Sequence, residues 1–217
     1  MGANDWLLVF SDGDAGKILA SGPVLDRSAA QEIAARMYPD RVITPIDDGT
    51  LGGSLSPEDG EIYVASYPGL TIVSTSDAAE DFPSMISASL LNAVPARDVY
   101  LHAMHSVVDW FAFAVWSGGD LRRALSLSPD SGIIENLGAP MPFEEPYWAG
   151  ERAVDHDLGD DDSEGDDFTD EEPYPLPFHP LDLGETALRE LLGFANEGAM
   201  PDDPDVAGLP VAGFAIT

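Results

Sequence analysis

Residues 110–116 (WFAFAVW) are apolar at every position. Successive side chains of an extended strand point to opposite faces of its sheet, so this segment as a strand is apolar on both faces. Such a strand is stable in the middle of a sheet that other elements cover on both sides. The segment therefore predicts an interior strand of a covered sheet.

Other sequence patterns predict the rest of that sheet. Pro68-Gly69 is turn chemistry that joins two apolar runs as a hairpin, and Gly118-Gly119 turns the chain after the WFAFAVW segment. The turn-rich stretch 45–60 predicts a long surface loop. Further strands are predicted at residues 5–10, 41–44, 61–67, 70–74, 121–128, 133–138 and 209–216.

Three helices are predicted beside these strands. An apolar residue recurs at every fourth position from Leu25 to Met37, which places these residues on one side of a helix that Asp26 caps and Pro39 ends. A second helix is predicted over residues 84–94. A third begins at Asp182 as its N-cap and ends near Gly193. The order of elements predicts an α+β fold with a mainly antiparallel mixed sheet and two to three flanking helices.

The chain is very acidic, with 40 Asp and Glu against 9 Lys and Arg and a formal charge of −31. That charge repels phosphate backbones and anionic membranes, so we expect neither direct nucleic-acid binding nor a membrane partner. It attracts basic protein surfaces and divalent cations. Solubility alone, or a high-salt cytoplasm, is the other interpretation of this composition.

Eleven of the acidic residues lie within residues 155–172. We therefore expect an α/β core at 1–154, an acidic flexible linker or insert at 155–173, and a C-terminal helix and strand at 174–217 that pack back on the core. The absence of cysteine excludes disulfides and thiolate sites. The amino terminus lacks the features of a signal peptide, so a cytoplasmic location is expected.

His102, His105 and Asp109 are the strongest candidates for a catalytic or metal site. On a helix their spacing would place all three on one face, as in a metal site built from two histidines and a carboxylate. The surrounding sequence favours a strand, on which His102 and His105 point to opposite faces. The alternative is histidines hydrogen-bonded at a strand end, with Asp109 at a bend.

Two weaker candidates involve single short motifs. Asp12 and Asp14 follow an apolar strand, where aspartate-nucleophile phosphatases place two carboxylates, but we favour the simpler interpretation of a polar turn that leaves the strand. Ser106 lies beside His105 and Asp109, yet catalytic triads are assembled across a fold rather than from adjacent residues. We therefore do not expect Ser106 to be a nucleophile.

The acidic segment contains a partial calcium-loop register. Asp160, Asp162, Glu164 and Glu171 fall at ligand positions, but Pro173 excludes the helix that should follow such a loop. We predict no dedicated cofactor, only weak divalent-cation binding. The candidate binding residues are Asp160, Asp161, Asp162, Glu164, Asp166 and Asp167.

Arg122 and Arg123 are rare cations in this chain. Arg123 lies on the side of its predicted strand that carries Leu121 and Leu125, so we expect it to pair with a carboxylate. An arginine that binds an anion in a pocket is the alternative.

Four strings of the sequence are distinctive: YLHAMHSVVDWFAFAVW (100–116), RALSLSPDSGIIENLG (123–138), PFEEPYWAGE (142–151) and YPLPFHPL (174–181). They resemble an uncharacterised actinobacterial family, a domain of unknown function. The resemblance extends more weakly to the first strand and to ITPIDDGTL, and it implies a shared fold but no established activity. In that comparison the acidic segment resembles a variable insert. GIIENLG is also loosely similar to sheet proteins that act as toxin-immunity partners.

Two classes of function fit these observations. The sequence favours a non-enzymatic binding, inhibitor or immunity-type protein whose partner has a basic surface. The alternative is a small metal-dependent hydrolase that uses His102, His105 and Asp109.

Overall fold

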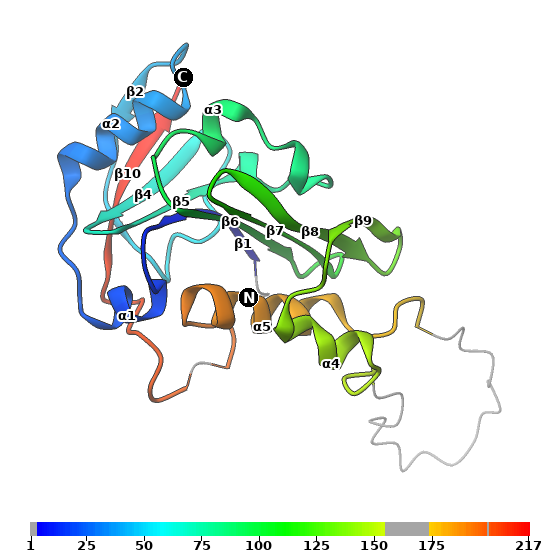
Figure 1. Ribbon diagram of the computed structural model, residues 1–217. Helices are drawn as coiled ribbons and strands as arrows, with labels where there is room; N and C mark the ends of the chain where they lie inside the picture. The colour runs from blue at the N-terminus through cyan, green and yellow to red at the C-terminus, as the bar shows by residue number, and fades with distance from the viewer. Residues whose placement is uncertain (1–3, 155–173, 199) are drawn as a thin grey trace, which may run out of the picture.

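The structure, a computed structural model, describes residues 4–154, 174–198 and 200–217 (Figure 1). Its strands pair in one antiparallel sheet. The short strand β3 (Gly49–Thr50) lies outside the main order and pairs with β10 (Pro210–Ile216). The predicted α+β fold with a mainly antiparallel sheet is confirmed. The main order is β2 (Ile43–Pro45), β10 (Pro210–Ile216), β4 (Glu61–Tyr67), β5 (Leu70–Thr75), β1 (Asn4–Ser11), β6 (Asp98–His105), β7 (Trp110–Ser117), β8 (Asp120–Ser128) and β9 (Gly132–Gly138).

Helices cover both faces of this sheet. The first face carries α2 (Arg27–Met37), α3 (Ala88–Leu91) and the 3₁₀ turns η1 (Ser76–Ala78) and η2 (Pro83–Met85). The second face carries α1 (Ala15–Ala20), α4 (Glu145–Trp148), α5 (Pro180–Leu192) and η3 (Pro142–Glu144). Figure 1 shows α2 and α3 above the sheet, and α4 and α5 below it.

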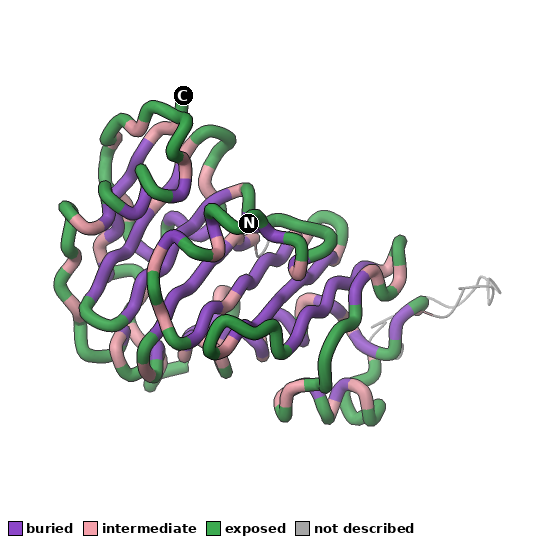
Figure 2. The backbone as a smooth tube through the Cα atoms, turned by 45° about the horizontal axis from the view of Figure 1, so that its top comes forward, coloured by how far each residue is buried: buried purple, intermediate pink, exposed green. Residues whose placement is uncertain are grey.

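The WFAFAVW segment forms an interior strand, as its composition predicts. β7 pairs with β6 and β8, and all of its residues from Trp110 to Trp116 are buried. Its two tryptophans pack in the core of the first face, while Phe111 and Phe113 pack in the core of the second. Figure 2 shows buried backbone running through the middle of the molecule, with exposed turns at its margin.

The strands from β6 to β9 form a four-stranded meander, although the sequence predicts three strands there. Residues 98–117 form two strands, β6 and β7, because residues 106–109 form a turn in which Asp109 has a positive φ of 47°. β1 does not pair with its neighbours in sequence but lies between β5 and β6. Strand ends from distant parts of the chain therefore meet at one end of the sheet.

The first predicted long helix is confirmed, and the other two differ from prediction. The side chain of Asp26 accepts a hydrogen bond from Ala29 N and caps α2 as expected. The helix predicted at 84–94 is wrong, because Ser87 is extended and caps a new single-turn helix, which breaks the pattern into η2 and α3. α5 begins two residues before Asp182, with His179 as its N-cap and Pro180 at the first helical position.

The prediction that residues 45–60 form a long surface loop is wrong in part. Residues 49–50 form β3, and Leu51 and Leu55 are buried against the second face. Backbone hydrogen bonds from Leu51 N to Leu209 O and from Trp6 N to Leu55 O hold this stretch in place. The SDGDAG loop contains Asp14, whose side chain caps α1.

Candidate functional site

His102 lies on β6 beneath α5 and is completely enclosed, with 1% of its side chain exposed. Its Nδ1 lies 2.6 Å from Asp5 Oδ1, and its Nε2 donates to Gly184 O at 2.9 Å. The carbonyl reaches the ring because residue 184 is glycine: a Cβ there would lie 2.9 Å from Met104 Cγ and 3.1 Å from Phe111 Cδ2. These contacts make His102 a bridge between β1, β6 and α5.

The Asp5–His102 pair retains a proton because of these contacts. Gly184 O can only accept, so Nε2 carries a hydrogen, and a second proton must lie between Nδ1 and Asp5 Oδ1. Burial raises the pKa of Asp5 more than His102 lowers it. Burial lowers the pKa of His102, but the Asp5 carboxylate and Gly184 O outweigh this and raise it overall. Asp5 Oδ2 is buried and has no hydrogen-bond partner.

His102, His105 and Asp109 do not converge. His105 packs against Trp6 on the first face, whereas His102 packs against Phe111 on the second. The Asp109 carboxylate lies 3.6 Å from His179 Nε2, on the segment that leads into α5. The geometry of the predicted metal-dependent hydrolase is therefore not formed, because the alternating strand directs the two imidazoles apart.

The other sequence candidates have structural partners. Asp12 Oδ1 accepts a hydrogen bond from Arg97 N at 2.9 Å, while Asp14 caps α1 and pairs with Lys17 at 2.8 Å. Ser106 donates from both its backbone N and its Oγ to Asn4 Oδ1. Both carboxylates therefore bind local backbone, since Asp12 accepts from the residue before β6 and Asp14 caps α1.

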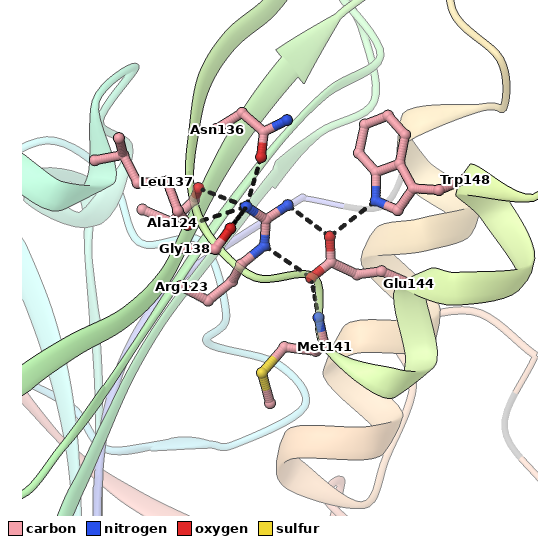
Figure 3. Close-up of polar contacts among 8 residues, drawn as sticks. All are labelled: Arg123, Ala124, Asn136, Leu137, Gly138, Met141, Glu144 and Trp148. Carbon is pink, nitrogen blue, oxygen red and sulfur yellow. Dashed lines mark hydrogen bonds and ion pairs between the residues drawn. The ribbon is translucent and has the colours of Figure 1, made fainter.

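Arg123 pairs with a buried carboxylate, as predicted, and its partner is Glu144 (Figure 3). Both side chains are fully buried, and Nε and Nη2 of Arg123 donate to the two oxygens of Glu144 at 2.8 and 2.7 Å. Nη1 donates to Asn136 Oδ1 and Leu137 O. Glu144 also accepts from Met141 N and Trp148 Nε1. This fully bonded network joins β8 and β9 to η3 and α4.

An open pocket of about 370 Å³ lies at the end of the sheet where β1, β6, β7, β8 and β9 meet. Aromatic rings form part of its wall: the centroid of Trp6 lies 5.6 Å from that of His105 and 6.3 Å from that of Trp110. Exposed carboxylates of Asp81 and Asp130 also line it. His105 Nδ1 is enclosed in this wall without a hydrogen-bond partner.

Hydrogen bonds from several elements hold the pocket in shape. Trp110 Nε1 donates to Ser126 Oγ at 3.2 Å, and Ser131 N donates to Ser128 Oγ at 3.1 Å. The backbone N and Oγ of Ser84 donate to the two oxygens of the buried Glu135, which fixes the chain just beyond Asp81. The pocket is therefore supported on rigid strands and pinned turns.

Comparison with known families identifies the chain. Residues 5–214 match a family of unknown function (DUF6928). The chain belongs to that family. The match extends from β1 into β10 and so includes every strand of the sheet. Comparisons of this DUF6928 protein with curated proteins and with solved structures find no match.

The described residues of this DUF6928 protein contain neither a candidate metal cluster nor a candidate membrane-spanning helix. Within residues 4–154, 174–198 and 200–217, no group of three His, Asp or Glu is placed to hold a metal ion. No helix in these ranges is long and apolar enough to span a bilayer. The six carboxylates predicted to bind cations, at residues 160–167, lie outside the described residues.

The sequence does not predict the aromatic pocket of the DUF6928 protein. Trp6, Asp81, Trp110 and Asp130 come from separate segments, and only the pairing of β1 with β6 brings Trp6 beside the β6–β7 turn. Of the residues that line the pocket, Asp130 gives a local sequence signal, because it is an acidic residue in a predicted turn. Such residues are common on protein surfaces, so this signal does not predict a pocket.

Proposed function

We propose that this chain is a non-enzymatic, cytoplasmic binding protein of the inhibitor or immunity type, and that its partner presents a basic surface. The observation that carries this proposal is the distribution of charge. Six of the nine cationic side chains (Lys17, Arg27, Arg97, Arg122, Arg123 and Arg189) form ion pairs with carboxylates of the chain. The excess of acidic groups is therefore not offset at the surface, and it attracts cations.

The state of the buried ionisable groups supports binding rather than hydrolysis. His102 and Asp5 bond each other and α5 in the core, and Arg123 and Glu144 satisfy each other there. Each of these pairs holds elements of the fold together. The accessible concave site instead combines aromatic rings with carboxylates, which suits recognition of cations.

Binding to a basic peptide, measured against salt, tests the proposal. The full chain should bind an alternating Arg–Ser peptide at low salt, and the affinity should fall steadily as salt screens the charges. A Gln–Ser peptide of equal length is the neutral control. Polyglutamate of matched charge is the control for a polyanion without a binding site.

Two outcomes would count against a binding function. If polyglutamate binds the Arg–Ser peptide as tightly as the chain does, the charge serves solubility rather than recognition. If the affinity is the same at low and high salt, recognition is not led by charge. A variant in which amides replace the eleven carboxylates of residues 155–172 should still bind, because the rest of the chain retains most of the acidic excess.

A further inference from the structure

We propose that the pocket of Trp6, His105, Trp110, Asp81 and Asp130 receives an arginine side chain of the basic partner. This inference rests on the proposed function. It names the binding site on this chain and the side chain that the partner inserts there. The pocket combines three features that suit a guanidinium group: aromatic rings, carboxylates that form no ion pair within the described part of the chain, and apolar contacts for the aliphatic stem.

The aromatic rings that line the pocket are tilted against one another. The planes of Trp6 and Trp110 are tilted by 46°, and those of Trp6 and His105 by 33°, so the rings do not cover one another as a parallel stack. The Trp110 indole is held by its bond to Ser126 Oγ, which uses its only hydrogen-bond donor. A tryptophan face is the best of the aromatic partners for a cation.

The two carboxylates are available to an incoming cation. Among the described residues, the side chains of Asp81 and Asp130 form no ion pair with any Lys or Arg, although six other cationic side chains have found acidic partners. Asp81 belongs to the segment between η1 and η2, and Asp130 to the β8–β9 turn. They therefore approach the pocket from two elements, which suits the several donors of a guanidinium better than the compact ammonium of lysine.

The pocket also provides apolar contact and is formed before binding. Val108 and Ile134 line it and can contact the methylene groups of an arginine stem. The hydrogen bonds of Ser84 to Glu135 and of Ser131 to Ser128 fix the turns on either side. A preformed site loses little conformational entropy when a side chain enters, so more of the contact energy appears as affinity.

Matched variants of the full chain, titrated calorimetrically with Arg–Ser and Lys–Ser peptides, test this assignment. The Asp81→Asn/Asp130→Asn variant and the Trp6→Leu variant should each bind the Arg–Ser peptide about tenfold more weakly than the wild type. Trp6→Phe keeps an aromatic face and should recover part of the loss. The wild type should prefer Arg–Ser over Lys–Ser.

The control variant is Asp40→Asn/Asp59→Asn, which changes the net charge equally at two exposed residues that do not line the pocket. It should weaken binding by no more than about twofold, through the general charge alone. If the two double variants weaken binding equally, or if both peptides bind alike, the pocket is not an arginine site. Salt-dependent binding would then persist and leave the proposed function standing, whereas a wild type that binds neither peptide would overturn both proposals.

Discussion

Replacing Arg123 by methionine should lower the free energy of unfolding by about 3–5 kcal/mol, measured by urea denaturation. The substitution leaves the Glu144 carboxylate fully buried and bonded only to Met141 N and Trp148 Nε1. A buried charge that has lost its counter-ion is strongly destabilising, because it has given up its hydration without a replacement.

The adjacent Arg122 provides the matched control. It is more than half exposed and lies 3.2 Å from Asp120, so Arg122→Met should change the stability by about 1 kcal/mol or less. The double variant Arg123→Met/Glu144→Leu should be more stable than Arg123→Met alone, because it removes the unpaired charge. Equal losses from Arg122→Met and Arg123→Met would show that the buried pair is not an important contact.

Replacing His102 by leucine should also lower the free energy of unfolding by about 3–5 kcal/mol. Asp5 would remain fully buried, and its Oδ1 would lose its partner, as Oδ2 already has none. Gly184 O would lose its donor. His105 lies on the same strand, but its Nδ1 has no hydrogen bond to lose. His105→Leu should therefore cost about 1 kcal/mol or less, and a larger loss from His105 than from His102 would contradict this account.

The Asp5–His102 pair also predicts how stability varies with pH. The pKa values of both groups are raised in the folded chain, so the folded state holds the shared proton more tightly than the unfolded state does. The stabilisation from His102 is complete below the pKa of an unfolded histidine, about 6.5, and is lost as the pH rises through the higher folded value. The free energy of unfolding should thus fall as the pH rises above that point.

A double variant that cannot titrate provides the control for this pH profile. Asp5→Asn/His102→Gln should lack the part of the decline that the pair causes, because neither amide binds or releases a proton in this range. Parallel profiles for the wild type and the double variant would show that the pair keeps no proton in the folded chain.

The sheet can be predicted from the sequence because its signals are local. Alternation in residues 121–128, continuous apolarity in 110–116 and the Pro68-Gly69 turn each specify a strand or turn without knowledge of the rest of the chain. The kind of side chain that pairs with Arg123 is predictable for a similar reason, since a cation on an apolar strand face needs a carboxylate. The partner itself, Glu144, follows from how η3 packs on the sheet and is not encoded locally.

The short elements and the sites depend on contacts between distant residues. η2 and α3 are separated because Ser87 caps a new turn, a choice that the propensities of residues 84–94 do not decide. The bridge from His102 to α5 requires the close approach that Gly184 permits. The aromatic pocket exists only because β1 inserts between β5 and β6, which carries Trp6 to the turn that follows His105.

The most direct test of charge-led recognition at the sheet end is an NMR titration of the ¹⁵N-labelled chain with the Arg–Ser peptide. The account predicts that the largest shift changes occur at the start of β1, at residues 79–81, and in the β6–β7 and β8–β9 turns, with little change at His102. Shift changes spread evenly over the acidic surface, or centred on His102 and Gly184, would contradict it.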